Sequence, residues 1–297
     1  MAIRHEKVQG DGVQLHCAVA EEARADAGRP LILFLHGFPE FWAAWRVPLE
    51  YFAARGWRAV APDLRGYNLS EKPAAVEAYK AKHLVADVLA LAGHYSPGKK
   101  FVLVGHDWGG AVAWSVAISQ GQRLSRLVMI NSPHPYTFWR ELTRNPAQQK
   151  ASEYMNLFRL PKAERVLSEN GYARLLGSFA HLPESWRKEL VAAWAQPGAL
   201  TGGLNFYRAS PLYPPTADDL GAAKLKLEPK DFTVRVPTLI LWGERDTALL
   251  PGCIEGLEAC VPDLKLVRVP EASHWIVHEQ PDLVCREMER FVSSGST

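Results

Sequence analysis

Residues 101–110 read FVLVGHDWGG, and this stretch decides the fold. The apolar run Phe101 to Val104 suits a buried strand, and the run AVAWSVAIS after Gly110 has helical length. Glycines on both sides of Asp107 allow a sharp turn between the two elements. An aspartate that only caps the following helix is the simpler alternative. With both glycines in register, the pattern predicts a nucleophile elbow that exposes Asp107 at the carboxyl edge of a sheet.

Apolar runs alternate with helix-like stretches along most of the chain. Strands are expected at 13–20, 31–35, 58–61, 101–104, 124–130, 238–242 and 264–269. Helices are expected at 43–55, 79–92, 111–119, 254–259 and 281–292. This alternation predicts an α/β fold with a mostly parallel, twisted sheet.

The pattern changes between residues 132 and 230. Helix-like pieces there are separated by prolines, and no strand signal interrupts them. We therefore expect a core domain formed by 1–131 and 231–297, and a helical cap domain formed by 132–230. The substrate pocket is expected between the two.

Composition excludes several other classes of protein. The 34 Lys and Arg against 32 Asp and Glu give a net charge of +2 without a block of like charges, so we expect neither a nucleic-acid nor a membrane partner. No signal-peptide pattern or membrane-spanning run is recognisable, which predicts a cytoplasmic location. The 4 cysteines form no C-x-x-C pair, so a zinc site is not predicted. No metal or organic cofactor is implied.

Two further polar residues follow predicted strands downstream. Asp246 comes after the strand 238–242, and His274 after the strand 264–269. A loop aspartate is usually only solvated, and most of the 10 histidines must be structural. The chain order of nucleophile, acid and histidine is nevertheless that of an α/β-hydrolase, and the joint placement predicts a catalytic triad.

The residues HGFP follow the predicted strand LILFL. In the predicted fold this position supplies a backbone N–H to an oxyanion hole, here from Phe38, and Trp108 N–H is the expected second donor. A plain turn would also explain the glycine and the proline. We assign His36, His106 and Glu40 to structural roles.

An aspartate in the nucleophile position predicts alkyl transfer. A carboxylate that attacks a saturated carbon leaves an ester, and water can hydrolyse that ester through a tetrahedral intermediate. His274 would activate the water, and Asp246 would orient His274. Haloalkane and epoxide hydrolysis both fit this scheme. An epoxide also needs a proton donor for the alkoxide that forms, and a tyrosine with a pKa of about 10 suits that role.

The chain resembles the epoxide hydrolases of the α/β-hydrolase fold over nearly its whole length. The motifs that carry the resemblance are HGFPE (36–40), DLRGY (63–67) and GHDWGG (105–110), together with Asp246 and His274. In that family two cap tyrosines hold the epoxide oxygen, and the similar segments EYMNLF and FYR contain Tyr154 and Tyr207. The resemblance implies that a small apolar epoxide and water give a vicinal diol through a hydroxyalkyl ester on Asp107.

Two positions depart from the family pattern, and two other functions stay open. Phe206 replaces a frequent Trp, and Asn68 stands where Gly is frequent after DLRGY. Neither departure touches the proposed chemistry. A haloalkane dehalogenase could use the indole of Trp108 to bind halide, but Phe38 offers no side-chain donor where that class commonly has Asn. A non-catalytic ligand-binding protein of the same fold usually loses part of the triad, whereas this chain has all of it.

Overall fold

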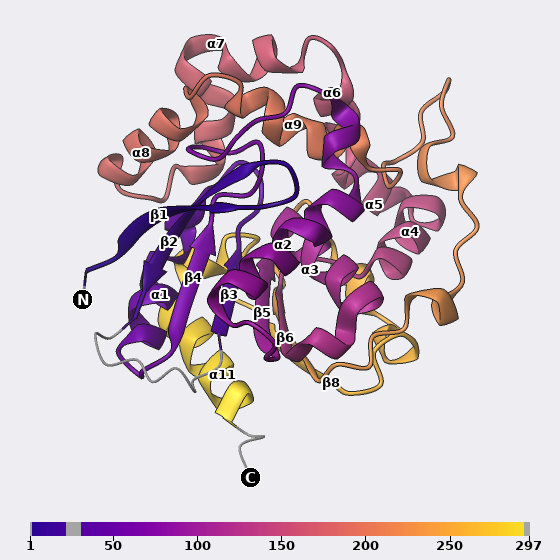
Figure 1. Cartoon of the computed structure of the whole chain (residues 1–297). Coiled ribbons are helices and arrows are strands. Elements are labelled where there is room, and N and C mark those ends of the chain that lie inside the picture. Colours follow the sequence, from indigo (N-terminus) through magenta and orange to yellow (C-terminus); the bar gives the residue numbers. More distant parts are fainter. Residues whose placement is uncertain (1, 22–30, 294–297) are drawn as a thin grey trace.

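A single sheet forms the centre of the protein (Figure 1). The computed structural model describes residues 2–21 and 31–293, and the described strands run in the order β1-β2-β4-β3-β5-β6-β7-β8. Their bounds are β1 Arg4–Gln9, β2 Gln14–Ala20, β3 Leu31–Leu35, β4 Arg58–Pro62, β5 Phe101–His106, β6 Leu124–Ile130, β7 Thr238–Gly243 and β8 Leu264–Val269. Neighbouring strands from β4 to β8 are parallel, which confirms the predicted α/β sheet.

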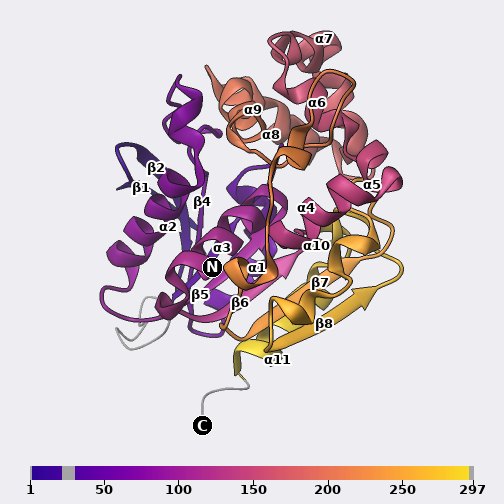
Figure 2. The same cartoon turned by 90° about the vertical axis from the view of Figure 1, so that its right-hand side faces the viewer.

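Helices cover both faces of this sheet (Figures 1 and 2). Their bounds are α1 Arg46–Ala53, α2 Ala81–Tyr95, α3 Asp107–Gln120, α10 Ile276–Glu279 and α11 Pro281–Ser293. Helix α1 packs against α11, and α2 packs against α3. Because helices lie on both sides, β3, β5 and β7 are buried at every residue. This burial explains why these strands appear in the sequence as unbroken apolar runs.

The secondary structure contains one strand that was not predicted, and one helix prediction was wrong. Strand β1 was not predicted, because the residues RHEKVQ are mostly charged and exposed and lack an apolar alternation. It pairs antiparallel with β2 at the edge of the sheet, where charged side chains discourage pairing with another chain. The helix expected at 254–259 is replaced by two 3-10 turns, Pro251–Ile254 and Leu257–Ala259, with Gly256 between them at a φ of 71°.

The chain between β6 and β7 is helical and contains no strand in its described structure. Its helices are α4 Pro135–Arg144, α5 Pro146–Ala151, α6 Glu153–Arg159, α7 Ala163–Leu176, α8 Glu184–Trp194 and α9 Ala199–Ala209. Figures 1 and 2 both place α6 to α9 beyond one end of the sheet. We propose that 132–230 is the cap domain and that 1–131 with 231–297 is the core domain.

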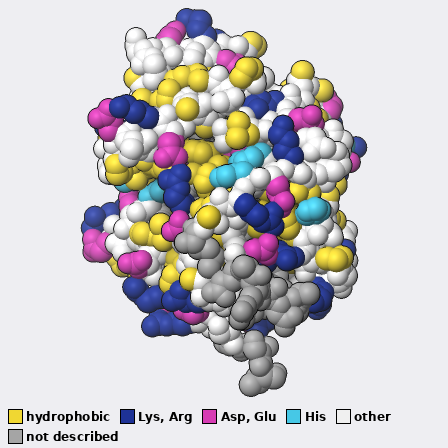
Figure 3. Space-filling model, turned by 60° about the vertical axis from the view of Figure 1, so that its left-hand side comes forward, with side chains coloured by type: hydrophobic (Ala, Val, Ile, Leu, Met, Phe, Trp, Pro, Cys, Tyr) yellow, Lys and Arg dark blue, Asp and Glu magenta, His cyan; other side chains and the backbone are white. Residues whose placement is uncertain are grey.

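Across 2–21 and 31–293, none of the helices combines the length and apolar composition that crossing a bilayer requires. On the face drawn in Figure 3, basic and acidic side chains are interspersed.

The cysteines at 17, 253, 260 and 285 are buried and form no disulfide.

Candidate active site

The elbow between β5 and α3 has the geometry that its glycines predict. Asp107 adopts a φ of 50°, a left-handed conformation that costs a non-glycine residue energy and persists only when surrounding structure enforces it. A Cβ on Gly109 would lie 2.1 Å from the carbonyl oxygen of Leu35, and one on Gly105 would lie 2.6 Å from the Cα of Gly110. Only glycines therefore let α3 pass this close to β3 and β5.

The two carboxylate oxygens of Asp107 have different surroundings. Oδ1 accepts a hydrogen bond of 2.7 Å from the backbone N–H of Phe38. Oδ2 lies 3.7 Å from Nε2 of His274. The loop that carries Phe38 can approach because Gly37 has no side chain, since a Cβ there would lie 2.3 Å from that of Asp107. Oδ1 therefore occupies the predicted oxyanion hole, while Oδ2 faces the histidine.

The second donor predicted for the oxyanion hole is the backbone N–H of Trp108. Trp108 lies in the first turn of α3, where backbone N–H groups have no acceptor within the helix. Its indole ring packs edge-on against the ring of Tyr207, with 5.0 Å between centroids. Trp108 thus borders both the elbow and the cap.

Asp246 and His274 lie on loops after β7 and β8 and meet beside Asp107. Nδ1 of His274 and Oδ2 of Asp246 are 2.7 Å apart. Asp246 is buried and also accepts hydrogen bonds from Ala248 N–H, Leu249 N–H and the side chain of Asn131. Burial opposes its charge, but the charge of His274 and these hydrogen bonds lower the pKa of Asp246. Asp246 is therefore held as a carboxylate that orients His274.

His274 is a strong base in this arrangement. Burial by itself lowers the pKa of the ring, but the charge and hydrogen bond of Asp246, followed by the charges of Asp107 and Glu40, outweigh it. Together they raise the pKa of His274 from 6.5 to about 9. Because Asp107 is one of the causes, any reaction that neutralises Asp107 lowers the pKa of His274.

A buried network of His106, Glu40 and His278 contacts the backbone of His274. The sequence pattern had singled out only His106 and Glu40. Nε2 of His106 lies 2.9 Å from the backbone oxygen of His274, and its Nδ1 lies 3.4 Å from Oε2 of Glu40. His278, which we had not singled out, contacts the other oxygen of Glu40. Burial opposes the charge of Glu40, but His278 and His106 lower its pKa.

The candidate cap tyrosines lie together near Asp107. Tyr154 is on α6 and Tyr207 on α9, and their ring centroids are 6.2 Å apart. Phe158 contacts both rings, and Phe38 packs edge-on against Tyr207 at 5.4 Å. Burial, and after it nearby charge that includes Asp107, raises the pKa of both phenols. Both are therefore protonated at neutral pH and able to donate.

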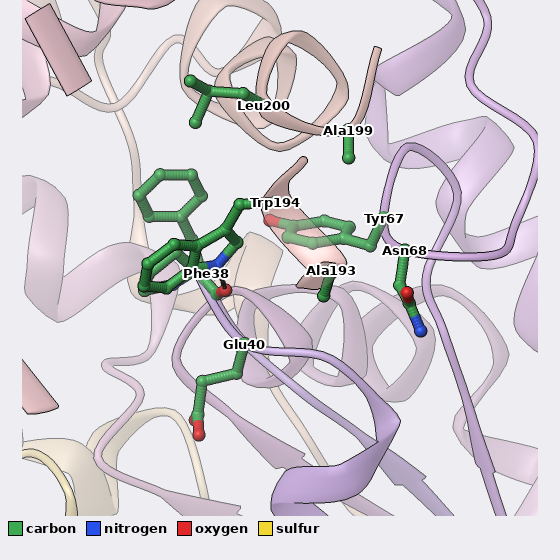
Figure 4. A pocket seen from close by; sticks show the side chains of 9 residues that line it. Phe38, Glu40, Tyr67, Asn68, Ala193, Trp194, Ala199 and Leu200 are labelled. Atoms are coloured by element: carbon green, nitrogen blue, oxygen red, sulfur yellow. Dashed lines mark hydrogen bonds between the residues drawn. The ribbon is translucent and has the colours of Figure 1, made fainter. Parts of the chain in front are cut away.

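A small cavity adjoins this cluster on the side of Phe38 (Figure 4). Trp194 and Leu200 line it from the helical segment, and Tyr67 lines it from the core. The indole N–H of Trp194 donates to the backbone oxygen of Pro39 and so joins the two sides. The hydroxyl of Tyr67 is buried without a hydrogen-bond partner among the described residues. The lining is mostly apolar, with Glu40 and Asn68 as its other polar members.

Comparison with known proteins agrees with this geometry. The family described as the alpha/beta hydrolase fold matches residues 30–281. The AB hydrolase superfamily protein YfhM of Bacillus subtilis is 38% identical, with 93% of each chain covered. Mouse epoxide hydrolase 4 is 35% identical over 94% of this chain and 76% of its own length. The crystal structure of Bacillus megaterium epoxide hydrolase with an inhibitor superposes with a TM-score of 0.86 at 32% identity, covering 97% of this chain and 100% of that one.

The chain therefore belongs to the α/β-hydrolase fold family, and within it to the epoxide hydrolases. Of the candidate residues, the structure brings Asp107, His274 and Asp246 together. His274 is within hydrogen-bonding distance of Asp246 and lies 3.7 Å from Asp107. The structure places Tyr154 on α6 and Tyr207 on α9, close enough for the charge of Asp107 to act on both phenols. In the part of the chain that the structure describes, no group of three His, Cys, Asp or Glu side chains has the arrangement of a metal site.

Proposed function

We propose that this protein hydrolyses epoxides to vicinal diols through a hydroxyalkyl ester on Asp107. The observation that carries the proposal is that Asp107 lies near two different kinds of proton-transfer group. Its Oδ2 lies 3.7 Å from Nε2 of His274. Its charge also acts on the buried phenols of Tyr154 and Tyr207, whose ring centroids are 6.2 Å apart. The names of the relatives support an epoxide as substrate.

In the first step, Oδ2 of Asp107 attacks an epoxide carbon and the carbon–oxygen bond of the ring breaks. The leaving oxygen would become an alkoxide, which is too basic to form without a proton donor. Tyr154 and Tyr207 hydrogen-bond that oxygen, and one of them transfers its proton to it. The products of this step are a hydroxyalkyl ester on Asp107 and a tyrosinate.

In the second step, His274 removes a proton from water, and the resulting hydroxide adds to the ester carbon of Asp107. The negative charge that develops on Oδ1 is stabilised by the N–H groups of Phe38 and Trp108. Collapse of this intermediate releases the diol and restores the carboxylate. The tyrosinate regains its proton from His274 when esterification of Asp107 lowers the pKa of that ring. His274 then keeps the proton that it takes from water, as in the free enzyme, so the enzyme ends in its starting state.

The ester also prepares His274 for its role. While Asp107 is charged, it helps to hold the pKa of His274 at about 9, so the ring is protonated at neutral pH. Esterification removes that charge and lowers the pKa of the ring. His274 therefore becomes a neutral base at the stage at which the ester needs one.

Turnover of two substrate panels tests this proposal. Wild type and Asp107→Ala are incubated with a panel of epoxides and a panel of haloalkanes, and diol is measured by mass and halide by ion chromatography. Asp282→Ala, on the exposed side of α11, is the matched control. Diol formation by wild type and by the control but not by Asp107→Ala supports the proposal. Halide release without diol would favour a dehalogenase, and binding without turnover a non-catalytic role.

A further inference from the structure

Each of the helices that carry the cap tyrosines has, in its last turn, an arginine that reaches the end of the other helix. We propose that Arg159 of α6 and Arg208 of α9 form a reciprocal clamp, and that this clamp positions Tyr154 and Tyr207 for opening the epoxide. The inference rests on the proposed function, since it assigns positioning residues to the first step of that reaction.

Arg159 is the last residue of α6 and bonds the end of α9. Its Nη1 donates to the backbone oxygens of Tyr207 and Ser210, the second at 3.0 Å, and lies 3.4 Å from that of Arg208. The carbonyls in the last turn of a helix have no partner within the helix, and an arginine is well suited to supply one. One of the acceptors belongs to Tyr207 itself. The guanidinium also lies 3.7 Å from the ring centroid of Tyr213, which fixes its plane.

Arg208 makes the complementary contact in the opposite direction. Its Nη2 donates to the backbone oxygen of Leu160, the residue that caps the carboxyl end of α6, at 3.2 Å. Both Nη atoms also bond the carboxylate of Glu164 on α7, at 2.7 and 2.8 Å. This bidentate pair is largely buried on the arginine side, so the orientation of the guanidinium is well defined. Each arginine therefore donates hydrogen bonds to backbone carbonyls at the carboxyl end of the other helix.

The clamp matters because it ties the short helix α6 to α9, which is itself packed against the core. A Cβ on Gly202 of α9 would lie 2.2 Å from the backbone oxygen of Gly66. Helix α6 spans only Glu153–Arg159, too short to be stable without tertiary contacts. Tyr154 and Phe158 lie one turn apart on it, and Phe158 fills the space between Tyr154 and Tyr207. A shift of α6 along α9 would move one phenol relative to the other. Displacements of about 1 Å in a reacting group can reduce a rate by about 100-fold.

A rapid-quench experiment on the two chemical steps tests the clamp. Arg159→Met removes the donors but keeps an unbranched side chain over Tyr213. Arg165→Met is the matched control, because Arg165 is exposed and pairs only with Glu169 one turn away on α7. We expect the rate of ester formation to fall about tenfold in Arg159→Met, with ester hydrolysis within about twofold of wild type. Both rates should be unchanged in Arg165→Met.

A double-mutant cycle separates positioning from general loosening. If Arg159 acts through the tyrosines, Arg159→Met should slow ester formation less in the Tyr154→Phe background than in wild type, because only Tyr207 is then left to position. Arg159→Lys keeps one donor and should recover part of the rate, and it serves if Arg159→Met does not fold. An unchanged rate of ester formation in both Arg159 variants, equal losses in both steps, or additive effects in the cycle would each overturn the clamp.

Failure of the clamp and failure of the proposed function give different results. If wild type forms no ester with any epoxide, the proposed function falls and the clamp with it. If wild type forms the ester and Tyr154→Phe slows its formation, the proposed function survives. The Arg159 variants then decide on the clamp alone.

Discussion

The two halves of the candidate site are held in different ways. On the core side, Asp107, Asp246 and His274 follow strands of one sheet, and backbone contacts place them. On the cap side, Tyr154 and Tyr207 are carried by helices that meet through side chains. On the core side, backbone N–H groups donate hydrogen bonds to Asp107 and Asp246. The backbone around Gly105 and Gly109 is also packed too closely to leave room for a Cβ. The cap contacts are mostly aromatic packing and the arginine bonds, although Gly202 of α9 also packs closely against the backbone of Gly66 in the core.

In the proposed mechanism, this difference assigns the two chemical steps to different regions. Ester hydrolysis would depend on the core, which supplies His274, Asp246 and the proposed oxyanion hole. Ester formation would depend on both regions, since the proposed nucleophile is in the core and the proposed proton donors are in the cap. Substitutions in the two regions should therefore affect the two steps differently.

The largest effect is expected from removing the base on the core side. His274→Ala should slow ester hydrolysis by about 1,000-fold or more, while ester formation continues. The intact enzyme should then gain the mass of the epoxide on a peptide that contains Asp107. His94→Ala, which changes an exposed histidine of α2, is the control and should accumulate no adduct. Rapid turnover by His274→Ala without an adduct would contradict the claim that ester hydrolysis depends on His274.

On the cap side the expected effect is smaller and falls on the other step. Tyr154→Phe and Tyr207→Phe should each slow ester formation by about 100-fold, because the alkoxide loses one hydrogen-bond donor. Hydrolysis of an ester already formed should change little. Tyr136→Phe, on α4, removes a phenol outside the site and should change neither step. Single-turnover quench kinetics measure both rates, and equal losses in both steps would contradict the division between regions.

The rigidity of the core edge can be tested by adding one methyl group. In Gly109→Ala the new Cβ would lie 2.1 Å from a backbone oxygen, so the free energy of unfolding should fall by more than about 3 kcal/mol. Gly93→Ala in α2 is the control, since a Cβ there has no neighbour within 4 Å. That change should stabilise the protein by about 0.5–1 kcal/mol. Urea unfolding measures both, and equal stability of the two variants would refute the backbone argument.

The charge on His274 should make the stability of the core edge depend on pH. Its pKa is about 9 in the folded protein and 6.5 in the unfolded chain, so its interactions stabilise the fold fully below pH 6.5. This contribution is lost as pH rises through 9, and it amounts to at most about 3 kcal/mol. The stability of wild type relative to His274→Gln should therefore decline between pH 6.5 and 9. A difference that is constant or grows with pH would contradict the assigned pKa.

The sequence predicted the core side better than the cap side. The elbow could be recognised because it consists of a short local pattern, an apolar strand followed by an aspartate with glycines on both sides. Asn68 is similar, since its φ of 39° explains why glycine is frequent there in the family. Tyr154 and Tyr207 could be found only through the resemblance, because tyrosines at helical spacing are common in packed cores. Nothing local distinguished them.

Other contributors could not be predicted, because they act across long separations in sequence. Asn131 follows β6 and bonds Asp246, and His278 reaches Glu40. The contacts of Arg159 and Arg208 with each other's helix join residues that are 48 positions apart in the sequence. An arginine at the end of a helix usually stays in solvent, so the clamp leaves no local signature.

The central claim is that the oxygen added to the epoxide comes from Asp107 rather than directly from water. A single turnover in ¹⁸O-labelled water, with enzyme in excess over epoxide, tests it most directly. The ester route predicts an unlabelled diol and one ¹⁸O atom in the peptide that contains Asp107, because water attacks the ester carbon. A labelled diol with unlabelled Asp107 would show that water opens the ring directly, and would contradict the account.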